Sequence, residues 1–189
     1  MKFNDLLNSN EQMRKTIPST ATLYRLFLFA FMLVVLASCS SRRHVAKAPH
    51  VNAPKIADAM ANLESKELYR FITDWTGVRY QLGGLDKSGI DCSGFALLLQ
   101  KNIYGRSLPR RSRDQADVIE EKRLGQLKEG DLIFFSFGGS AVDHVGVYLN
   151  DHYFVHASTT RGVIVDDLNL PQYQKALVKA GSLKGQLLK

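Results

Sequence analysis

Residues 89–95, Gly-Ile-Asp-Cys-Ser-Gly-Phe, most constrain the fold, because they place a cysteine between polar residues at the start of a predicted helix. Asp91 is suited to cap that helix, since its carboxylate can accept a hydrogen bond from a backbone N–H two or three residues on. Gly105 is placed to end the helix. Between them runs an apolar stripe at helical spacing, formed by Phe95, Leu98, Leu99 and Ile103. The pattern therefore predicts a helix with Cys92 at its first position.

Cys92 is a candidate nucleophile. The free N–H groups and positive dipole end of a helix N-terminus favour thiolate over thiol. The charge of Asp91 opposes this, so a basic partner is required. The alternative is a buried cysteine that acts as a small apolar residue. The polar flanks, Asp91 and Ser93, favour the nucleophile.

The first 38 residues have the features of a lipoprotein signal peptide. Residues 26–37 form an uncharged apolar run that is too short to span a membrane comfortably, and basic residues precede it. The run ends in Leu-Ala-Ser-Cys at 36–39, which resembles the bacterial lipobox. We expect residues 1–38 to be removed and Cys39 to carry lipid. A conventional signal peptide is the alternative, and either Met1 or Met13 can be the start.

Lipidation of Cys39 would leave Cys92 as the single remaining cysteine, since the chain has two. Processing also lowers the formal charge from +7 to +5, because four basic and two acidic residues leave. A basic exported protein suits anionic headgroups or cell wall, and we expect no nucleic-acid partner. Ser40 follows Cys39 where an aspartate would retain an inner-membrane lipoprotein, so Gram-negative sorting would lead to the outer membrane facing the periplasm.

Residues 39–57 contain two prolines and no periodic pattern, which predicts a flexible tether. We expect the folded domain to cover 58–189. The pattern of its first half predicts three helices. The first has an apolar face over 63–75 and ends near Gly77, and the second is the Cys92 helix. The third is short and runs from Ser112 to about Glu121 with a Ser112–Gln115 capping box. Strands are predicted at 132–135, 144–149, 153–157 and 163–165. Helices followed by strands favour an α+β fold with an antiparallel sheet.

His144 and His156 are the candidate partners of Cys92, because a cysteine nucleophile needs a base and the base needs an orienting group. With a two-residue turn at 150–151, His144 would lie directly opposite Ala157. Because directly opposed residues share a face and successive residues alternate, His156 would then point away from His144. A three-residue loop, 149–151 or 150–152, restores a shared face, with Asn150 or Asp151 left-handed. We therefore predict both imidazoles on one face towards Cys92, with Val145, Val147 and Val155 on the other face.

A metal site is a weaker interpretation. His152 and His156 have a zinc-finger-like interval, but on a strand they would lie about 13 Å apart at roughly 3.3 Å per residue. No Cys-x-x-Cys pair accompanies them. We expect no metal and no cofactor.

Several short motifs in order resemble the NlpC family of cell-wall cysteine peptidases over about residues 60–180. They are Arg79-Tyr80, Gly83-Gly84, 89–95, Leu108-Pro109-Arg110, Gly130-Asp131-Leu132, 144–148 and 154–158. The resemblance implies a papain-like α+β fold and hydrolysis of peptide bonds in peptidoglycan stem peptides. Arg111 departs from the pattern, in which one arginine would suffice.

The same resemblance implies roles by position. Cys92 is the nucleophile, His144 the base and later acid, and His156 the orienting group. Tyr80 matches the tyrosine near the oxyanion site, with a packed aromatic as the alternative. Asp91 and Ser93 match positions that line the substrate cleft.

Three functions stay open at this point: a membrane-anchored endopeptidase, a non-catalytic wall-binding lipoprotein, and a papain-like amidase or acyltransferase. The sequence does not identify which peptidoglycan bond is cut or which adaptor acts on the enzyme. We expect a monomer.

Overall fold

The computed structural model describes residues 53–185 together with Ala21, Tyr24 and Arg25. The chain separates into two units, residues 1–48 and 49–189, and the fold lies in the second. Apart from those three residues, the expected signal peptide lies outside the described residues, as do Cys39 and the first part of the expected tether. Within the described residues, no helix is long and apolar enough to cross a membrane.

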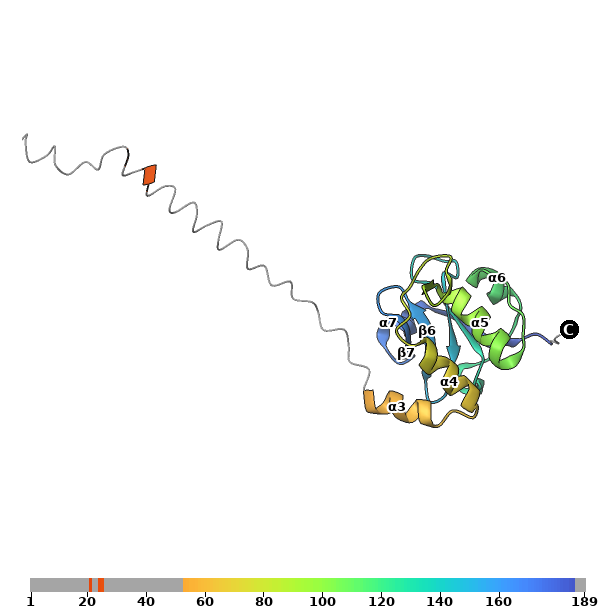
Figure 1. Ribbon diagram of the computed structural model, residues 1–189. Coiled ribbons are helices and arrows are strands. Elements are labelled where there is room, and N and C mark those ends of the chain that lie inside the picture. The colour runs from red at the N-terminus through yellow and green to blue at the C-terminus, as the bar shows by residue number, and fades with distance from the viewer. Residues whose placement is uncertain (1–20, 22–23, 26–52, 186–189) are drawn as a thin grey trace, which may run out of the picture. The chain divides into compact units, whose positions relative to one another are not determined.

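A β-sheet forms the centre of the fold (Figure 1). It is antiparallel and six-stranded, with strand order β3-β8-β4-β5-β6-β7. Its strands are β3 (Ile119–Glu121), β4 (Leu132–Phe135), β5 (His144–Tyr148), β6 (Tyr153–Ser158), β7 (Gly162–Asp167) and β8 (Leu177–Leu183). A separate two-stranded hairpin, β1 (Leu85–Asp86) and β2 (Gly89–Ile90), leads into the cysteine helix. Apart from one short helix between β7 and β8, the helices come before this sheet along the chain, as the sequence predicts.

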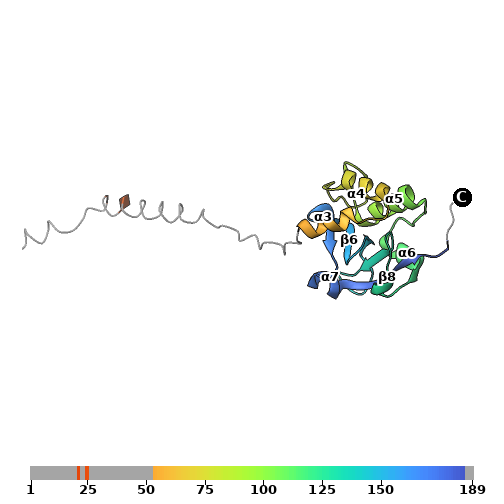
Figure 2. The ribbon, with the colours of Figure 1, turned by 90° about the horizontal axis from the view of Figure 1, so that it is seen from below.

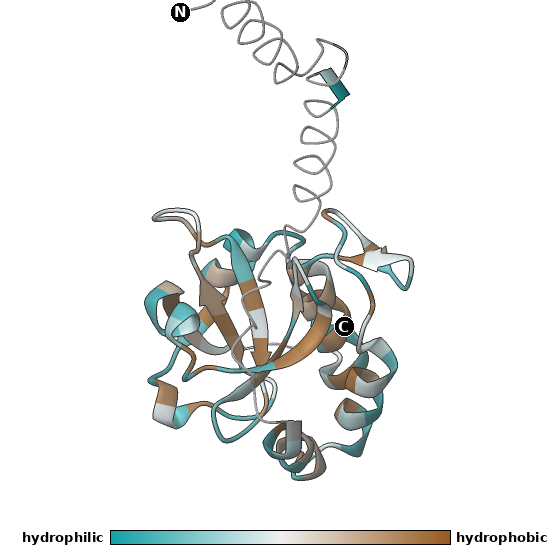
Figure 3. Ribbon diagram, turned by 90° about the vertical axis from the view of Figure 1, so that its left-hand side faces the viewer, coloured by the Kyte–Doolittle hydropathy of each residue, from teal (hydrophilic) through white to brown (hydrophobic). Residues whose placement is uncertain are grey.

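Helices cover both faces of this sheet. They are α3 (Ala53–Ala61), α4 (Lys66–Trp75), α5 (Cys92–Tyr104), α6 (Ser112–Asp117) and α7 (Pro171–Ala176), with a 3₁₀ turn η1 (Leu124–Gln126). Figure 2 shows α4 and α5 together on one side of the strands and α7 on the other. The central strands carry much of the apolar surface, whereas polar residues gather on the outer loops and helices (Figure 3).

Strand alternation divides the core in two. Val145, Val147 and Val155 point to the α5 side and pack with Phe95 and Leu99 of that helix. The intervening residues point to the other face, where Phe135 and Phe154 pack against Tyr173 of α7. Because successive side chains alternate between the faces, the parity of a residue in β5 or β6 decides which of the two faces it is on.

The helix ends follow the predicted chemistry at α5 and depart from it at α6. Asp91 caps α5, and Gly105 ends it in the left-handed conformation with φ 63°. Ser112, by contrast, is the first residue of α6, the cap is Arg111 without a side-chain bond, and the helix stops at Asp117. The predicted capping box is wrong because Gln115 is turned inward, where it donates to the carbonyl oxygens of Ser93 and Pro109.

Two boundaries also differ from the sequence prediction. Helix α3 begins at Ala53, so residues 53–57, expected in the tether, are helical. Strands β3 and β8 and helix α7 were not predicted. Residues 119–121, expected as the end of a helix, instead pair with β8 at the edge of the sheet.

Candidate active site

Cys92 is the first residue of α5 and is 5% exposed. The carboxylate of Asp91 accepts from the N–H of Gly94 at 2.7 Å, which satisfies one of the free amides of the first turn. Burial raises the pKa of the Cys92 thiol to about 11, although a backbone hydrogen bond from Val145 lowers it in part. Desolvation of the charged form therefore outweighs the helix end, and the need for a basic partner that the sequence indicated remains.

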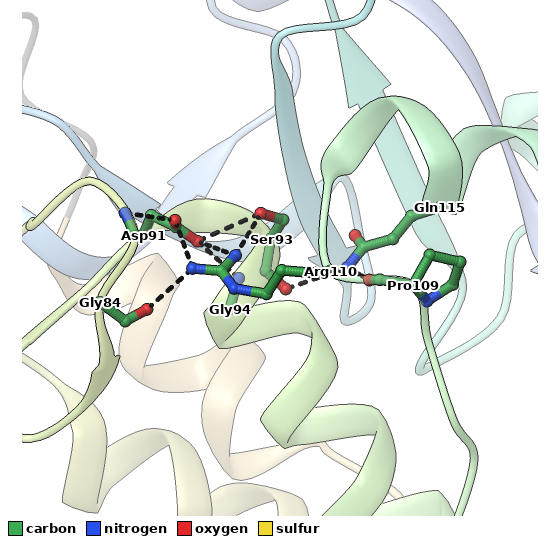
Figure 4. A network of polar contacts seen from close by, with 8 residues as sticks. Gly84, Asp91, Ser93, Gly94, Pro109, Arg110 and Gln115 are labelled. Atoms are coloured by element: carbon green, nitrogen blue, oxygen red, sulfur yellow. Dashed lines mark hydrogen bonds and ion pairs between the residues drawn. The ribbon is translucent and has the colours of Figure 1, made fainter.

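Arg110 holds Asp91 through both oxygens of its carboxylate (Figure 4). Nη1 donates to Oδ1 at 2.9 Å and Nη2 to Oδ2 at 2.7 Å. Burial alone would raise the pKa of Asp91, but the bonds from Arg110 and from the amides of Gly94 and Gly83 outweigh it and lower the pKa. Asp91 is thus an ionised carboxylate beside the thiol, and Arg110 offsets its charge.

The two adjacent arginines separate in the structure. Arg110 also donates to the hydroxyl of Ser93 at 3.0 Å, and Ser93 donates to Asp91. Arg111 points to the surface, where it pairs with Asp114 at 2.8 Å. The second arginine is therefore outside this polar network, although its side chain borders the same cavity.

His144 and His156 lie together, both almost fully buried, with Nε2 of His144 2.7 Å from Nδ1 of His156. Val147 pairs with Val155 and Tyr148 with Phe154, a register that leaves residues 150–152 as the loop. The predicted three-residue loop and shared face are confirmed. Asp151 has the left-handed conformation that the prediction gave to Asn150 or Asp151, and His152 has it as well, with φ values of 43° and 74°.

The imidazoles point to the face of the sheet that is opposite to α5. Val145, Val147 and Val155 are on the α5 side in one cluster with Cys92, whereas the ring of His144 is 6.1 Å from that of Phe135. The three valines lie on the face opposite to the imidazoles, as predicted, but the valine face and not the histidine face packs with Cys92. Cys92 instead reaches β5 at its first residues, where Val145 bonds the thiol and His144 is the preceding residue.

Two cavities meet at this point. One, of about 390 Å³, is lined by Cys92, Asp91, Ser93 and Arg110, and the other, of about 420 Å³, is lined by His144, His156 and Arg161. Tyr80 and Asp143 border both cavities. Among the described residues, no hydrogen bond joins the Cys92 thiol to His144. The structure thus brings all six predicted site residues in the described part of the chain to adjoining cavities.

Tyr80 is half-buried and forms an isolated bridge with Ile90, directly before the cysteine helix. Burial raises its pKa to about 12, and the neighbouring Cys92 and Asp91 add to the shift. The hydroxyl therefore remains protonated at neutral pH and is available as a hydrogen-bond donor at the junction of the two cavities.

A buried polar cluster behind His156 was not predicted from the sequence. Asp166 of β7 accepts hydrogen bonds from Arg161 and from the hydroxyl of Tyr173. Its Oδ2 also lies 3.1 Å from Nε2 of His156. The alternation of side chains in the next hairpin, β6–β7, is the signal that could have placed Asp166 beside His156. His156 pairs with Ile164, and Asp166 is two residues further along β7 on the same face.

Burial controls the charge of both histidines. It lowers the pKa of His144 to about 3, with a further contribution from His156. It also lowers the pKa of His156, against the opposing effect of Asp166. The resting site at neutral pH is therefore a neutral thiol with neutral imidazoles. In residues 53–185 and the three described N-terminal residues, no group of three His, Cys, Asp or Glu side chains is arranged to hold a metal.

Comparison with known proteins identifies the family. Residues 77–182 match the NlpC/P60 family. Murein DD-endopeptidase MepS/Murein LD-carboxypeptidase of Escherichia coli strain K12 is 35% identical over 161 residues, which cover 77% of this chain and 85% of that protein. A probable endopeptidase of Haemophilus influenzae is 36% identical over 161 residues, with 81% and 94% covered.

A solved structure gives the same result for the fold. An NlpC/P60 family protein from Bacillus cereus superposes with a TM-score of 0.57 at 31% identity, covering 61% of this chain and 39% of that one. This likeness confirms the predicted α+β, papain-like fold. Because the family match spans more than half of the sequence and relatives align along most of it, this protein belongs to the NlpC/P60 family.

Proposed function

We propose that this chain is a cysteine endopeptidase that hydrolyses amide bonds in the stem peptides or cross-links of peptidoglycan. Family membership and the endopeptidase names of its relatives support the substrate class. One observation carries the mechanism: Cys92 and His144 line adjoining cavities that share Tyr80, while His156 binds the far nitrogen of His144.

The reaction starts from the neutral pair. As Sγ of Cys92 attacks the scissile carbonyl carbon, its proton passes to Nδ1 of His144, the ring nitrogen that His156 leaves free. The product of this step is a tetrahedral oxyanion on the substrate and an imidazolium at His144. His156 keeps the ring of His144 in orientation, as the third group of such sites does.

The oxyanion needs donors that are already in position. The backbone N–H of Cys92 at the start of α5 and the hydroxyl of Tyr80 are the two groups suited to this role. His144 then gives its proton to the leaving amine, and an acyl-enzyme thioester remains on Cys92. Water attacks the thioester with His144 again as base, which releases the acid product and restores the thiol.

We assign the two sides of the scissile bond to the two cavities. The leaving amine must be near His144, so it belongs to the cavity of His144 and Arg161. The acyl part is then held in the cavity of Cys92, Asp91 and Ser93. Both oxygens of Asp91 already accept bonds from Arg110, so we assign Asp91 chiefly to holding the cavity wall.

Lipid on Cys39 would complete the picture of a domain tethered to a membrane and acting on the cell wall. The apolar run at 26–37 and the lipobox at 36–39 support this anchor. Ser40 supports the outer membrane, facing the periplasm. The tether would begin at Cys39 and end before α3, which starts at Ala53, and the catalytic domain would act as a monomer.

The test is digestion of purified peptidoglycan by the full-length protein in detergent, with products identified by mass spectrometry. New free amines and carboxyl groups within the peptides are expected, and these masses identify the bond cut. Cys92→Ser should abolish them. Cys39→Ser, which changes the other cysteine, should retain them. Binding to peptidoglycan without any new product would instead establish the wall-binding alternative, and cleavage of only non-wall amides would establish the amidase or acyltransferase.

A further inference from the structure

Asp166 is fully buried behind His156 and has more donors than a single ion pair requires. Nη1 of Arg161 donates to its Oδ1 at 3.2 Å. The other oxygen, Oδ2, accepts from Nη2 of Arg161 and from the hydroxyl of Tyr173, and it faces Nε2 of His156 at 3.1 Å. With a guanidinium and a phenol bound to it, the carboxylate is held in one orientation relative to His156.

An ionised carboxylate can only accept hydrogen bonds. Nε2 of His156 must therefore carry a proton, and in the neutral ring Nδ1 is then an acceptor. That acceptor is 2.7 Å from Nε2 of His144, so His144 must donate from Nε2. Its Nδ1 consequently holds a lone pair. The proton positions of both rings follow from the carboxylate in two steps.

We propose that Asp166 is a positioning residue that fixes the tautomers of His156 and His144, and so keeps Nδ1 of His144 unprotonated to receive the thiol proton. The proposal deepens the function given above and rests on it for its catalytic meaning. If both rings had the other tautomer, Nδ1 of His144 would carry the proton and could not act as the base.

Tyr173 makes the role of Asp166 necessary. Its hydroxyl is also 3.3 Å from Nε2 of His156. Without the carboxylate, this hydroxyl would donate to Nε2, the proton of His156 would move to Nδ1, and His144 would become an acceptor at Nε2 with hydrogen at Nδ1. The tyrosine therefore opposes the active order of protons unless Asp166 takes its hydrogen bond.

The tautomers can be read directly. Full-length protein with nitrogen-15 histidine is studied in detergent at neutral pH, and two-bond nitrogen–proton correlations are assigned with His144→Gln and His156→Gln variants. We expect both rings to be protonated at Nε2 only. A wild-type His144 protonated at Nδ1 would overturn the proposal, and this readout does not depend on any activity or on the folding of an Asp166 variant.

Substitutions then separate positioning from support of the fold. Asp166→Ala should reverse both tautomers and lower kcat by about 10²- to 10⁴-fold, the range of general acid–base catalysis, with little change in KM. Adding Tyr173→Phe should remove the reversal and recover part of kcat, a gain that a purely structural role would not give. Asp167→Ala, at the half-buried neighbour, should leave tautomers and kcat as in the wild type.

Unchanged tautomers and kcat in folded Asp166→Ala would overturn the proposal, as would a double variant no better than the single one. Failure of the proposed function is distinguishable from both: the wild-type protein would then show the expected tautomers and yet cut no peptidoglycan.

Discussion

Arg110 binds both carboxylate oxygens of Asp91, and the aspartate is the residue that directly precedes the candidate nucleophile. The side chain of Asp91 is 6% exposed, whereas that of Arg110 is 35% exposed. The pair therefore has its negative end in the protein interior. Both the cap of α5 and the wall of the Cys92 cavity depend on this contact.

Arg110→Met should destabilise the fold, because it leaves a buried carboxylate without its cation. Breaking one side of a buried pair costs about 3–5 kcal/mol, and the partial exposure of Arg110 reduces the expected loss to about 2–3 kcal/mol. Urea unfolding measures it. Arg111→Met is the matched control and should leave the midpoint unchanged, since its partner Asp114 is on the surface. Equal effects of the two variants would show that the Asp91 contact is not special.

The rate of alkylation of Cys92 should depend on pH as expected for a thiol with a high pKa. Because burial raises this pKa to about 11, the rate with iodoacetamide should rise about tenfold for each pH unit between pH 7 and 10. The Cys39→Ser variant gives a single thiol for the measurement. A rate that is already at its plateau near pH 7 would mean a resting thiolate–imidazolium pair and would contradict the neutral site.

Acid should destabilise the protein through His144. Its pKa is about 3 in the folded chain against 6.5 for the unperturbed group, so between these values the unfolded chain binds a proton that the folded chain does not. The contribution of His144 to the free energy of unfolding is therefore fully present above about pH 6.5 and is lost as the pH drops towards 3. His156 acts in the same direction. His144→Gln should reduce the loss between pH 7 and 5; an identical loss would refute the assignment.

Cys39 should carry the lipid and Cys92 should not. In a host with lipoprotein processing, Cys39→Ser should accumulate as unprocessed precursor without acyl chains, because only that cysteine follows the lipobox. Cys92→Ser should be processed and acylated like the wild type. Intact mass spectrometry of the membrane fraction reads both results. A Cys39→Ser protein that is still cleaved and acylated would rule out the lipobox.

Local and parity rules explain what the sequence predicts well. Asp91 and Gly105 define α5 because capping depends only on neighbouring residues. The His144–His156 register follows from an even separation and a loop of odd length. Both arguments need no knowledge of distant parts of the chain.

The failures come from long-range contacts. Gln115 fits a capping box locally, but its amide reaches Ser93, 22 residues away in sequence. Strand β8 has only weak alternation, and it forms because β3 and β4 pair with its two edges. The pKa of Cys92 depends on burial under the assembled sheet, which no local pattern around the residue encodes.

The central claim is that Cys92 forms an acyl-enzyme, and the most direct measurement is the intact mass of the protein after rapid acid quenching during turnover of soluble peptidoglycan fragments. Wild-type and Cys39→Ser proteins should both show an added mass equal to the acyl half of the substrate, mapped to Cys92 by peptide analysis and removed by hydroxylamine. Cys92→Ala should show no adduct and no product. Turnover by folded Cys92→Ala, or an adduct mapped to any other residue, would contradict the mechanism.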